Sequence, residues 1–330
     1  MESSPMKIGN IELLHGLTLA PMAGYTDRAM RLVCREAGAE YSVTEMVSAK
    51  AVAYGDQKTF SLAKIQADEG PVAVQIFGSE PVFMAEAAKI LSEGSLPLAS
   101  GDCVRPVAID INMGCPVKKI FSNGEGSALM KSPALIEKTV KAVKLATSLP
   151  VTVKIRSGIN GESINATDCA LAAEAGGADA LCIHGRTREQ MYGGLADRKI
   201  IEKVKNCLHI PLLANGDITN AETALSMLRD TGADGISVGR GAVGNPFIFS
   251  EILAALENKS YTPPSYAERV GAALRQLTLA CEDKGERVAV VEARKQIALY
   301  IRSFSGAAKI RAIINRAVTY KEVEEALLSI

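Results

Sequence analysis

Short apolar runs recur eight times along the first 240 residues of the chain. Their starts lie 24 to 44 residues apart, which suits one strand, one loop and one helix per unit. Near-continuous apolar runs of this kind are typical of parallel strands that are covered on both faces. The predicted strands are Leu17–Ala23, Tyr41–Met46, Pro71–Phe77, Pro106–Met113, Pro150–Arg156, Ala180–Gly185, Pro211–Asp217 and Gly235–Arg240.

The segments between the runs carry helix start and stop signals. Asp27 precedes a helical pattern over residues 28–37, and Ser132-Pro133 opens another. Asn220 precedes a third pattern, which Gly232 closes. Repetition of this unit predicts an α/β fold of the (β/α)₈ TIM-barrel class, with a doubly wound open sheet as the alternative.

The pattern changes after Gly244. A helix is predicted over Asn245–Ala255, followed by a polar, proline-containing segment at Glu257–Ser265 and then by helical patterns without a strand-like run. We therefore predict a catalytic barrel domain over residues 1–256 and a helical domain over residues 257–330.

Composition narrows the class of protein. With 330 residues, 48% of them hydrophobic, and a formal net charge of zero, the chain has the composition of a soluble globular protein. Seven cysteines occur without a C-x-x-C pair, which gives no support to zinc-ribbon or thioredoxin-like sites and no reason to expect a metal. The polar start and the lack of an 18-residue apolar run predict a cytoplasmic protein that does not enter membranes, with a monomer as the default.

Net neutrality gives no global reason to expect nucleic acid, so any such expectation rests on local charge. Between residues 294 and 316 the chain has six cations and no acidic residue. Such a run is either a solvated helix face or a surface that meets phosphates. The six are Arg294, Lys295, Arg302, Lys309, Arg311 and Arg316.

Polar residues stand at or just after the carboxyl ends of the predicted strands. A barrel interior favours branched apolar side chains, and the carboxyl ends of barrel strands are where active sites lie. Taken singly each has a structural explanation, and Cys115 is equally readable as a small buried hydrophobe. Together they predict one polar ring, composed of Pro21, Met22, Ala23, Glu45, Gln75, Asn112, Cys115, Lys154, His184, Arg186, Asn215, Gly216, Asp217, Gly239 and Arg240.

The glycines near the predicted polar ring narrow the class of ligand that it could bind. They follow the seventh and eighth predicted strands, where barrels bind phosphate through backbone N–H groups, and Arg240 adds a cation. Gln75 can donate to and accept from a heterocycle edge, and Lys154 can stabilise an anionic ring. These features suit flavin mononucleotide (FMN), and a sugar phosphate fits them nearly as well.

The motifs, taken in order, resemble those of the tRNA-dihydrouridine synthases, nearest to the bacterial B type. They are APMAGYTDRAMR, VTEM, VQIFG, DINMGCPVKK, GSALM, VKIRSG, IHGRTR, ANGDI and GRGAVGNPFIF. The resemblance implies an FMN-bound barrel, a C-terminal helical region that binds tRNA, and reduction of uridine to dihydrouridine with NADPH as the reductant.

The resemblance also implies roles for individual residues. Cys115 matches the proton donor, and Asn112 would lie near the flavin and the uracil. Flavin contacts would come from Pro21, Met22, Ala23, Gln75, Lys154 and His184, and contacts to the ribityl phosphate end from Asn215, Gly216, Asp217, Gly239 and Arg240. Further substrate contacts would come from Glu45, Arg186, Arg188, Arg294, Lys295 and Arg302.

The implied chemistry is consistent with these residue types. Hydride from flavin N5 would reach C6 of uracil while Cys115 protonates C5, and an ordinary thiol with a pKa of about 8.5 still carries its proton at pH 7. Lys154 would stabilise the anionic reduced ring. The uracil would have to leave the tRNA fold to reach a barrel mouth.

Some features depart from the family pattern or leave alternatives open. The segment Leu96–Arg105 is long and irregular and brings Cys103, while Phe247 stands where the family often has Trp. Alternative hypotheses are an FMN barrel for a free pyrimidine such as dihydroorotate, an aldolase-like barrel with Lys154 as a Schiff-base lysine, and an RNA-binding protein without activity. The modified uridine, and the choice of NADPH over NADH, stay open.

Overall fold

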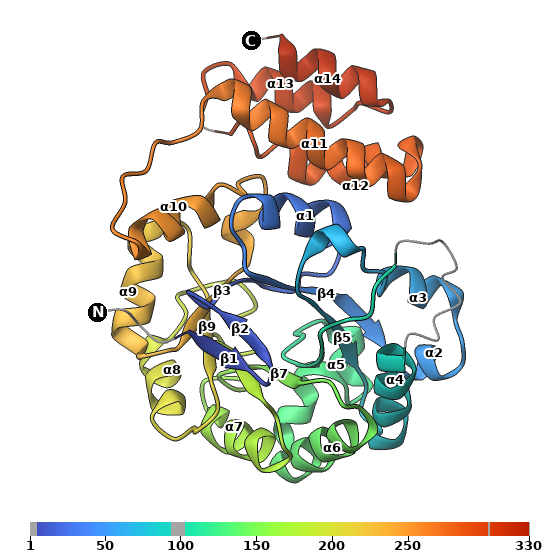
Figure 1. Ribbon diagram of the computed structural model, residues 1–330, viewed down its shortest axis with the longest axis vertical. Helices are drawn as coiled ribbons and strands as arrows, with labels where there is room; N and C mark the ends of the chain where they lie inside the picture. The colour runs from blue at the N-terminus through green and yellow to red at the C-terminus, as the bar shows by residue number, and fades with distance from the viewer. Residues whose placement is uncertain (1–4, 94–102, 303, 330) are drawn as a thin grey trace.

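The computed structural model describes residues 5–93, 103–302 and 304–329, and its centre is a closed barrel of eight parallel strands (Figure 1). The last strand pairs with both its predecessor and the first strand, so the sheet has no open edge. The (β/α)₈ prediction is confirmed and the open doubly wound sheet is excluded. The strands are β3 (Leu17–Leu19), β4 (Tyr41–Ser48), β5 (Val72–Phe77), β6 (Ala108–Met113), β7 (Val151–Arg156), β8 (Ala180–His184), β9 (Leu212–Asn215) and β10 (Gly235–Val238).

Helices surround the strands and start where the sequence signals place them. Asp27, Ser132 and Asn220 each accept a hydrogen bond from the backbone N–H three residues later, and Gly232 ends its helix with φ 64°. The main outer helices are α1 (Arg28–Glu36), α4 (Pro81–Glu93), α6 (Pro133–Ala146), α7 (Ala166–Ala175), α8 (Arg198–Lys205), α9 (Ala221–Thr231) and α10 (Ile248–Leu256), with short α2 (Ala49–Ala53), α3 (Gln57–Leu62) and α5 (Lys118–Ser122) in the connections.

Side chains alternate between the outside and the inside of the barrel. On β5, Val72, Val74 and Ile76 pack outward in the cluster that includes the surrounding helices. Ala73 faces inward with Tyr41, in a separate apolar cluster at the amino-terminal end of the barrel. Polar positions of the same parity, such as Gln75, therefore fall at the carboxyl-terminal end.

A two-stranded hairpin closes the amino-terminal end of the barrel. The strands β1 (Met6–Ile8) and β2 (Ile11–Leu13) pair antiparallel, and their apolar residues join the inner cluster. The sequence prediction missed this hairpin, although Gly9-Asn10 between two short alternating runs is a hairpin signal. The plug leaves the opposite end of the barrel as the place for a ligand.

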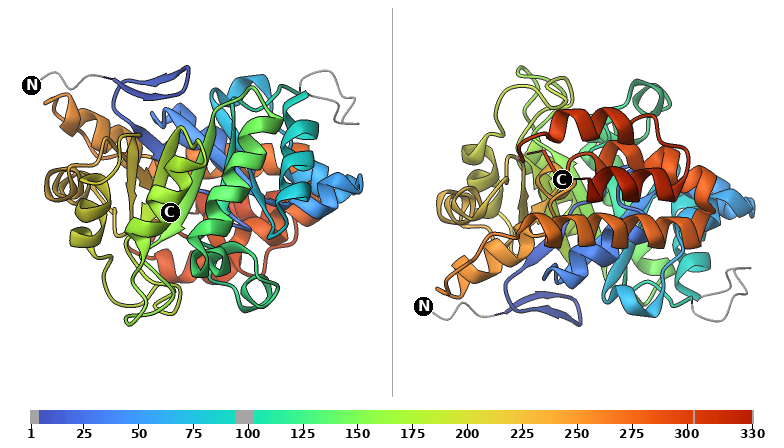
Figure 2. Two further views of the ribbon diagram at one scale, coloured as in Figure 1. Left: turned by 90° about the horizontal axis from the view of Figure 1, so that it is seen from below. Right: turned by 90° about the horizontal axis from the view of Figure 1, so that it is seen from above.

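A helical region follows the barrel and has its own core. It comprises α11 (Tyr266–Lys284), α12 (Glu286–Ile297), α13 (Ala307–Ile314) and α14 (Tyr320–Leu328). Figure 2 shows these helices, in orange to red, packed beside the barrel, on the flank where Figure 1 places α1. The predicted boundary after residue 256 lies where α10 ends and a segment without helix, residues 257–265, begins. The division into two domains stays a prediction.

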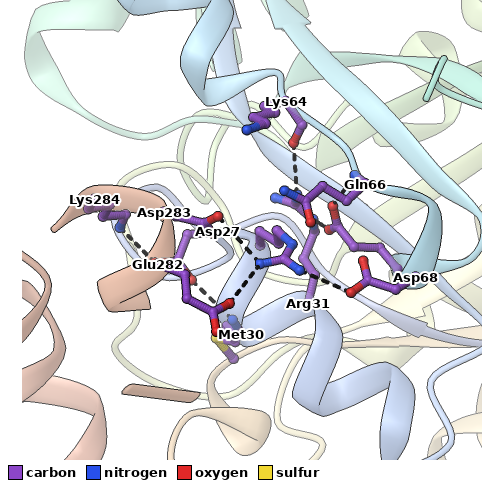
Figure 3. A network of polar contacts seen from close by, with 11 residues as sticks. Asp27, Met30, Arg31, Lys64, Gln66, Asp68, Glu282, Asp283 and Lys284 are labelled. Atoms are coloured by element: carbon purple, nitrogen blue, oxygen red, sulfur yellow. Dashed lines mark hydrogen bonds and ion pairs between the residues drawn. The ribbon is translucent and has the colours of Figure 1, made fainter. Parts of the chain in front are cut away.

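The helical region is joined to the barrel beside α1 by apolar and ionic contacts. Apolar side chains of α1, including Leu32, pack against Leu279 and its neighbours on α11 and α12. Arg28 lies 3.0 Å from the Asp68 carboxylate of the barrel and 3.4 Å from that of Asp283 on α11. Figure 3 shows this network, in which Lys284 also reaches Asp27 at 2.7 Å. These contacts fix the helical region relative to the first strand-to-helix loop of the barrel.

A buried ion pair lies beneath this network. The Arg31 side chain is 2% exposed and donates to the fully buried Glu69 carboxylate at 2.6 Å, and also to the carbonyls of Thr26 and Lys64. Because Thr26 ends the loop after β3, Arg31 ties that loop to the segment before β5.

The irregular segment before β6 and the absence of a membrane span were both predicted from sequence. Most of the segment Leu96–Arg105 lies outside the described residues, while Cys103 near its end pairs with Gln66 in an isolated antiparallel β-bridge of the backbone. Among the helices that the structure describes, none combines the length and the apolar character needed to span a bilayer.

Replacing the buried arginine tests its weight in the fold. Arg31→Met leaves the Glu69 carboxylate buried without its cation, so the free energy of unfolding is expected to fall by about 3–5 kcal/mol. Urea unfolding followed by circular dichroism measures this change. The control is Lys321→Met, which breaks the exposed Lys321–Glu325 pair and should leave the stability unchanged. A fall of less than about 1 kcal/mol for Arg31→Met would contradict the account.

Candidate active site

A cavity of about 930 Å³ lies at the carboxyl-terminal ends of the strands. Every one of the eight strands contributes a lining residue near or just beyond its carboxyl end, and Arg269, Leu299 and Arg302 of the helical region line the cavity as well. A volume of this size is typical of sites for drug-sized ligands and cofactors. The cavity is thus bounded both by the barrel mouth and by the helical region.

Most of the predicted site residues meet in this cavity. Those that line it are Pro21, Met22, Ala23, Gln75, Asn112, Cys115, Lys154, His184, Asn215, Gly216, Asp217, Gly239, Arg240 and Arg302.

The other predicted site residues lie next to the lining or further away within the described part of the chain. Glu45 accepts from the Gly24 N–H, beside the loop that lines the cavity, and Arg186 is buried behind Asp217. Arg188 lies 4.0 Å from the Phe121 ring centre, and Lys295 lies 4.4 Å from that of Tyr25. Arg294 donates to the Ala317 carbonyl, which gives its guanidinium a partner inside the helical region.

Cys115 lies on the loop after β6, and hydrogen bonds of the backbone hold it there. Its N–H donates to Asn112 Oδ1 at 2.9 Å, and its carbonyl accepts from Ser127 Oγ at 2.7 Å. Gly126 has φ +58°, and a Cβ there would come within 2.9 Å of Cys115 Cβ, so this close approach requires glycine.

The Cys115 thiol keeps its proton at neutral pH. Burial raises its pKa, and the Val117 N–H and the Arg156 cation only partly oppose that rise. The thiol is therefore suited to donate a proton and is poorly suited to act as a thiolate nucleophile.

Lys154 projects from the end of β7 into the cavity. Its ammonium donates to Asn215 Oδ1 at 2.9 Å, and Asn215 in turn donates from Nδ2 to the Ser237 carbonyl at 2.7 Å. The second bond fixes the Asn215 amide, so its oxygen faces Lys154. The ammonium has three N–H donors, and this bond uses one of them.

The loops after β9 and β10 place cations around one carboxylate. Asp217 accepts from Arg186 at 2.7 Å and from the Ala196 N–H at 2.8 Å, and Arg240 lies 3.9 Å away. Burial opposes ionisation of Asp217, but these bonds and cations outweigh it and hold its pKa below the usual range. Because Asp217 is itself an anion, it would not bind an anionic ligand directly. Its role towards such a ligand is to orient Arg186 and Arg240.

Gly216 is required by its surroundings. It has φ +128°, and an added Cβ would lie 2.6 Å from Ala196 Cβ. The chain can therefore pass close beneath the mouth only with glycine at this position.

His184 at the end of β8 is a neutral ring. Burial lowers its pKa, and the surrounding cations Lys154, Arg156, Arg186 and Arg240 lower it further, to about 2. A neutral imidazole offers both an acceptor and a donor nitrogen at the floor of the cavity.

Several lining residues were missed in the sequence analysis. Arg156 is buried and donates to the carbonyls of Gly114 and Thr187, and so joins the Cys115 loop to the loop after β8. Arg156 lies two residues after Lys154 on β7, so both side chains point to the same face of the strand, and this spacing could have identified Arg156 from the sequence. Arg240 stacks at 4.7 Å over Tyr192, which also lines the cavity, and no sequence pattern marks that pair. Within the described residues, no group of histidine, cysteine and carboxylate side chains is placed to hold a metal.

Comparisons with known proteins identify relatives of the whole chain. The family model described as dihydrouridine synthase (Dus) matches residues 18–330. A probable tRNA-dihydrouridine synthase of Rickettsia conorii is 40% identical over 94% of this chain and 91% of its own. A tRNA-dihydrouridine synthase B of Vibrio vulnificus is 40% identical over 94% of both chains, and a probable tRNA-dihydrouridine synthase 1 of Synechocystis is 39% identical over 94% of this chain and 84% of its own.

Solved structures resemble the barrel at low identity. Morphinone reductase is 12% identical with a TM-score of 0.52, over 81% of this chain and 92% of that one. The 6-hydroxypseudooxynicotine amine oxidase of Pseudomonas geniculata N1 is 13% identical with a TM-score of 0.58, over 78% of this chain and 50% of that one. At these identities the likeness shows the fold alone.

The neutral state of His184 has a measurable consequence. The pKa of His184 is about 2 in the folded protein and about 6.5 in the unfolded chain. Below about pH 6.5 the imidazole is therefore protonated in the unfolded chain and not in the folded protein, so the free energy of unfolding falls as the pH falls. The His184 ring resonances are expected to stay constant between pH 5 and 8 by NMR. Between pH 6.5 and 4.5, His184→Gln should lose about 2 kcal/mol less stability than the parent protein. A titration midpoint of the ring between pH 5 and 8 would contradict this assignment.

Proposed function

The chain belongs to the dihydrouridine synthase family, and from this membership we propose that it reduces uridine to 5,6-dihydrouridine in tRNA, with FMN as cofactor and NADPH as reductant. The single observation that carries the proposal is the position of Cys115. This protonated thiol lines the same cavity as Lys154 and the helical region, so an acid, a cation and an RNA-facing surface converge there.

The donor set of the cavity fits FMN. The amides of Gln75 and Asn112 and the ammonium of Lys154 offer N–H groups to the acceptor-rich edge of an isoalloxazine ring. Arg240 and the glycine-containing loops at Gly216 and Gly239 offer a cation and backbone donors to a phosphate. In this assignment Pro21, Met22 and Ala23 line the ring, and His184, Asn215 and Asp217 complete the wall.

A bound flavin, once reduced by NADPH, would supply the hydride that is added to C6 of uracil. The residues of this chain supply the rest. Cys115 holds a proton on Sγ and delivers it to C5, and the backbone bonds at its N–H and carbonyl keep that sulfur in place. Lys154 supplies positive charge beside the ring, as preorganised electrostatic stabilisation.

The helical region supplies the contacts to RNA in this proposal. Arg302 and Arg269 line the cavity, and Lys295, Lys309 and Arg316 of the same region are exposed. A uracil that enters the barrel mouth must leave its stack, so cations near the mouth would hold the phosphates on either side of it. Arg294 contributes less to this surface because its guanidinium is bonded to Ala317.

Removing the thiol tests the acid assignment. Cys115→Ala is expected to retain bound FMN while the rate of dihydrouridine formation falls by about 10²–10⁴-fold, because C5 loses its proton donor. Flavin is measured by absorbance and dihydrouridine by mass spectrometry of tRNA digests. The matched control is Cys207→Ala, at the end of α8 on the far side of the barrel, which should retain full activity. Full activity of Cys115→Ala would refute the role.

Reversing charge beside the mouth tests the RNA surface. In the double variant Lys295→Glu and Arg302→Glu, tRNA affinity is expected to fall, and the slope of log affinity against log salt should lose about 0.7–0.9 for each phosphate contact removed. Binding is measured by fluorescence anisotropy at several salt concentrations, and NADPH oxidation by O₂ should persist. Lys138→Glu with Lys141→Glu, both exposed on α6, makes the same charge change on the outside of the barrel. Equal affinities for the two double variants would refute this surface.

A further inference from the structure

We propose that Asp110 is a positioning residue for this reaction, because its carboxylate fixes the direction of a chain of side-chain amides that ends at the Cys115 loop. The expected effect on the reaction rests on the proposed function. The chain itself rests on the observed hydrogen bonds among Asp110, Gln75, Asn112 and Cys115. Asp110 itself does not line the main cavity among the described residues.

The chain starts at a buried carboxylate on β6. Asp110 is 4% exposed and lies in register with Gln75 on β5 and Thr152 on β7. Its Oδ1 accepts from Thr152 Oγ1 at 2.5 Å, and its Oδ2 accepts from Gln75 Nε2 at 2.6 Å. Both oxygens therefore have a donor on a neighbouring strand.

Each amide then sets the orientation of the next. Because Gln75 directs its Nε2 to Asp110, its Oε1 is turned towards Asn112 and accepts from Nδ2 at 2.8 Å. Asn112 thereby turns its own Oδ1 to the loop, where it accepts from the N–H of Gly114 at 3.2 Å and of Cys115 at 2.9 Å. Every bond in the chain runs in the same direction.

An ionised carboxylate enforces this direction because it only accepts. A neutral amide at position 110 offers an NH₂ donor group on one side and an oxygen acceptor on the other, so Gln75 could bond it in either orientation. In the reversed orientation Asn112 would turn Nδ2 towards the N–H groups of Gly114 and Cys115, and donors would face donors. The negative charge therefore selects the arrangement that anchors the loop.

A donor faces each oxygen of the Asp110 carboxylate, and this geometry favours the ionised form. Burial raises the pKa of Asp110, and the hydrogen bonds from Thr152 and Gln75 and the nearby Lys154 cation only partly oppose that rise. The same cation lines the cavity, one level further along the barrel than Asp110.

The fixed direction also decides what the cavity presents to a ligand. Gln75 and Asn112 each have a second amide N–H, and both side chains line the cavity while their oxygens are used within the chain. The two amides therefore act as donors towards a ring with acceptor atoms at its edge.

The first test is the reactivity of Cys115 in the full-length protein with and without FMN. Asp110→Asn loosens the anchor on the Cys115 N–H, so the rate of iodoacetamide alkylation at Cys115 should rise by about 5–30-fold. Peptide mass spectrometry measures this rate, with Cys207 as an internal reference. Thr152→Ser keeps the hydroxyl that donates to the same carboxylate and leaves the amide chain intact, so its Cys115 rate should match the parent. An equal rise in Thr152→Ser, or no rise in Asp110→Asn, overturns the proposal.

The second test asks whether the effect passes through Gln75. Gln75→Met removes both hydrogen bonds of the Gln75 amide and should by itself raise the alkylation rate of Cys115. This variant tests the chain even where Asp110→Asn does not fold. Adding Asp110→Asn to Gln75→Met should then give no further rise, whereas additive rises would refute the transmission.

A spectroscopic readout connects the chain to the cofactor. The absorption bands of bound FMN should shift, and its dissociation constant should rise by about 5–30-fold, in Asp110→Asn but not in Thr152→Ser. If the parent protein binds no FMN, the proposed function fails, while the alkylation rates still decide on the chain. If FMN binds and its bands are identical in all variants, the positioning role fails and the proposed function stands.

Discussion

The structure depends on one constraint, which is the alternation of side chains along the strands of a closed barrel. Because the sheet has no edge, each residue of a strand faces either the surrounding helices or the interior, and a one-residue shift would exchange the two sets. The inward positions are apolar where the β1–β2 hairpin closes the barrel and polar at the other end. The register places Gln75, Asp110 and Thr152 on adjacent strands at one level, and Asn112 and Lys154 at the next. The site is thus a consequence of strand register, and loops add the thiol and the glycines.

Charge inside the mouth is arranged so that donors face the cavity and acceptors are used within the protein. The oxygens of Asn112, Gln75 and Asn215 each accept a hydrogen bond from a neighbouring protein group. Asp217 is held by Arg186, and His184 is kept neutral by burial and by the cations around it. A cavity of this kind favours a ligand rich in acceptors and negative charge, which is the property shared by a flavin phosphate and an RNA segment.

The sequence predicted the parts of the fold that depend on local pattern. All eight strands were predicted from apolar runs, and Asp27, Ser132 and Asn220 cap helices as expected. The hairpin that plugs the barrel was missed because its two short strands lie outside the repeating strand-and-helix unit on which the prediction was based. Contacts between distant elements were beyond pattern reasoning. In the sequence, the cations between residues 294 and 316 cannot be told apart by pattern. In the structure, Arg294 donates to the Ala317 carbonyl, Lys295 lies over the Tyr25 ring and Arg302 lines the cavity. Packing within the helical region decides the role of Arg294, and packing of that region against the barrel decides those of Lys295 and Arg302.

The central claim is that one cavity holds both a flavin and a uracil from tRNA. The most direct test is an anaerobic absorption experiment on the purified protein, in which NADPH is added first and unmodified tRNA second. The account predicts flavin bands that bleach with NADPH and return on addition of tRNA, with one dihydrouridine formed for each flavin reoxidised. Bands that stay bleached with tRNA and return only with a free pyrimidine would contradict the RNA substrate. A colourless protein that FMN does not reconstitute would contradict the flavin site itself.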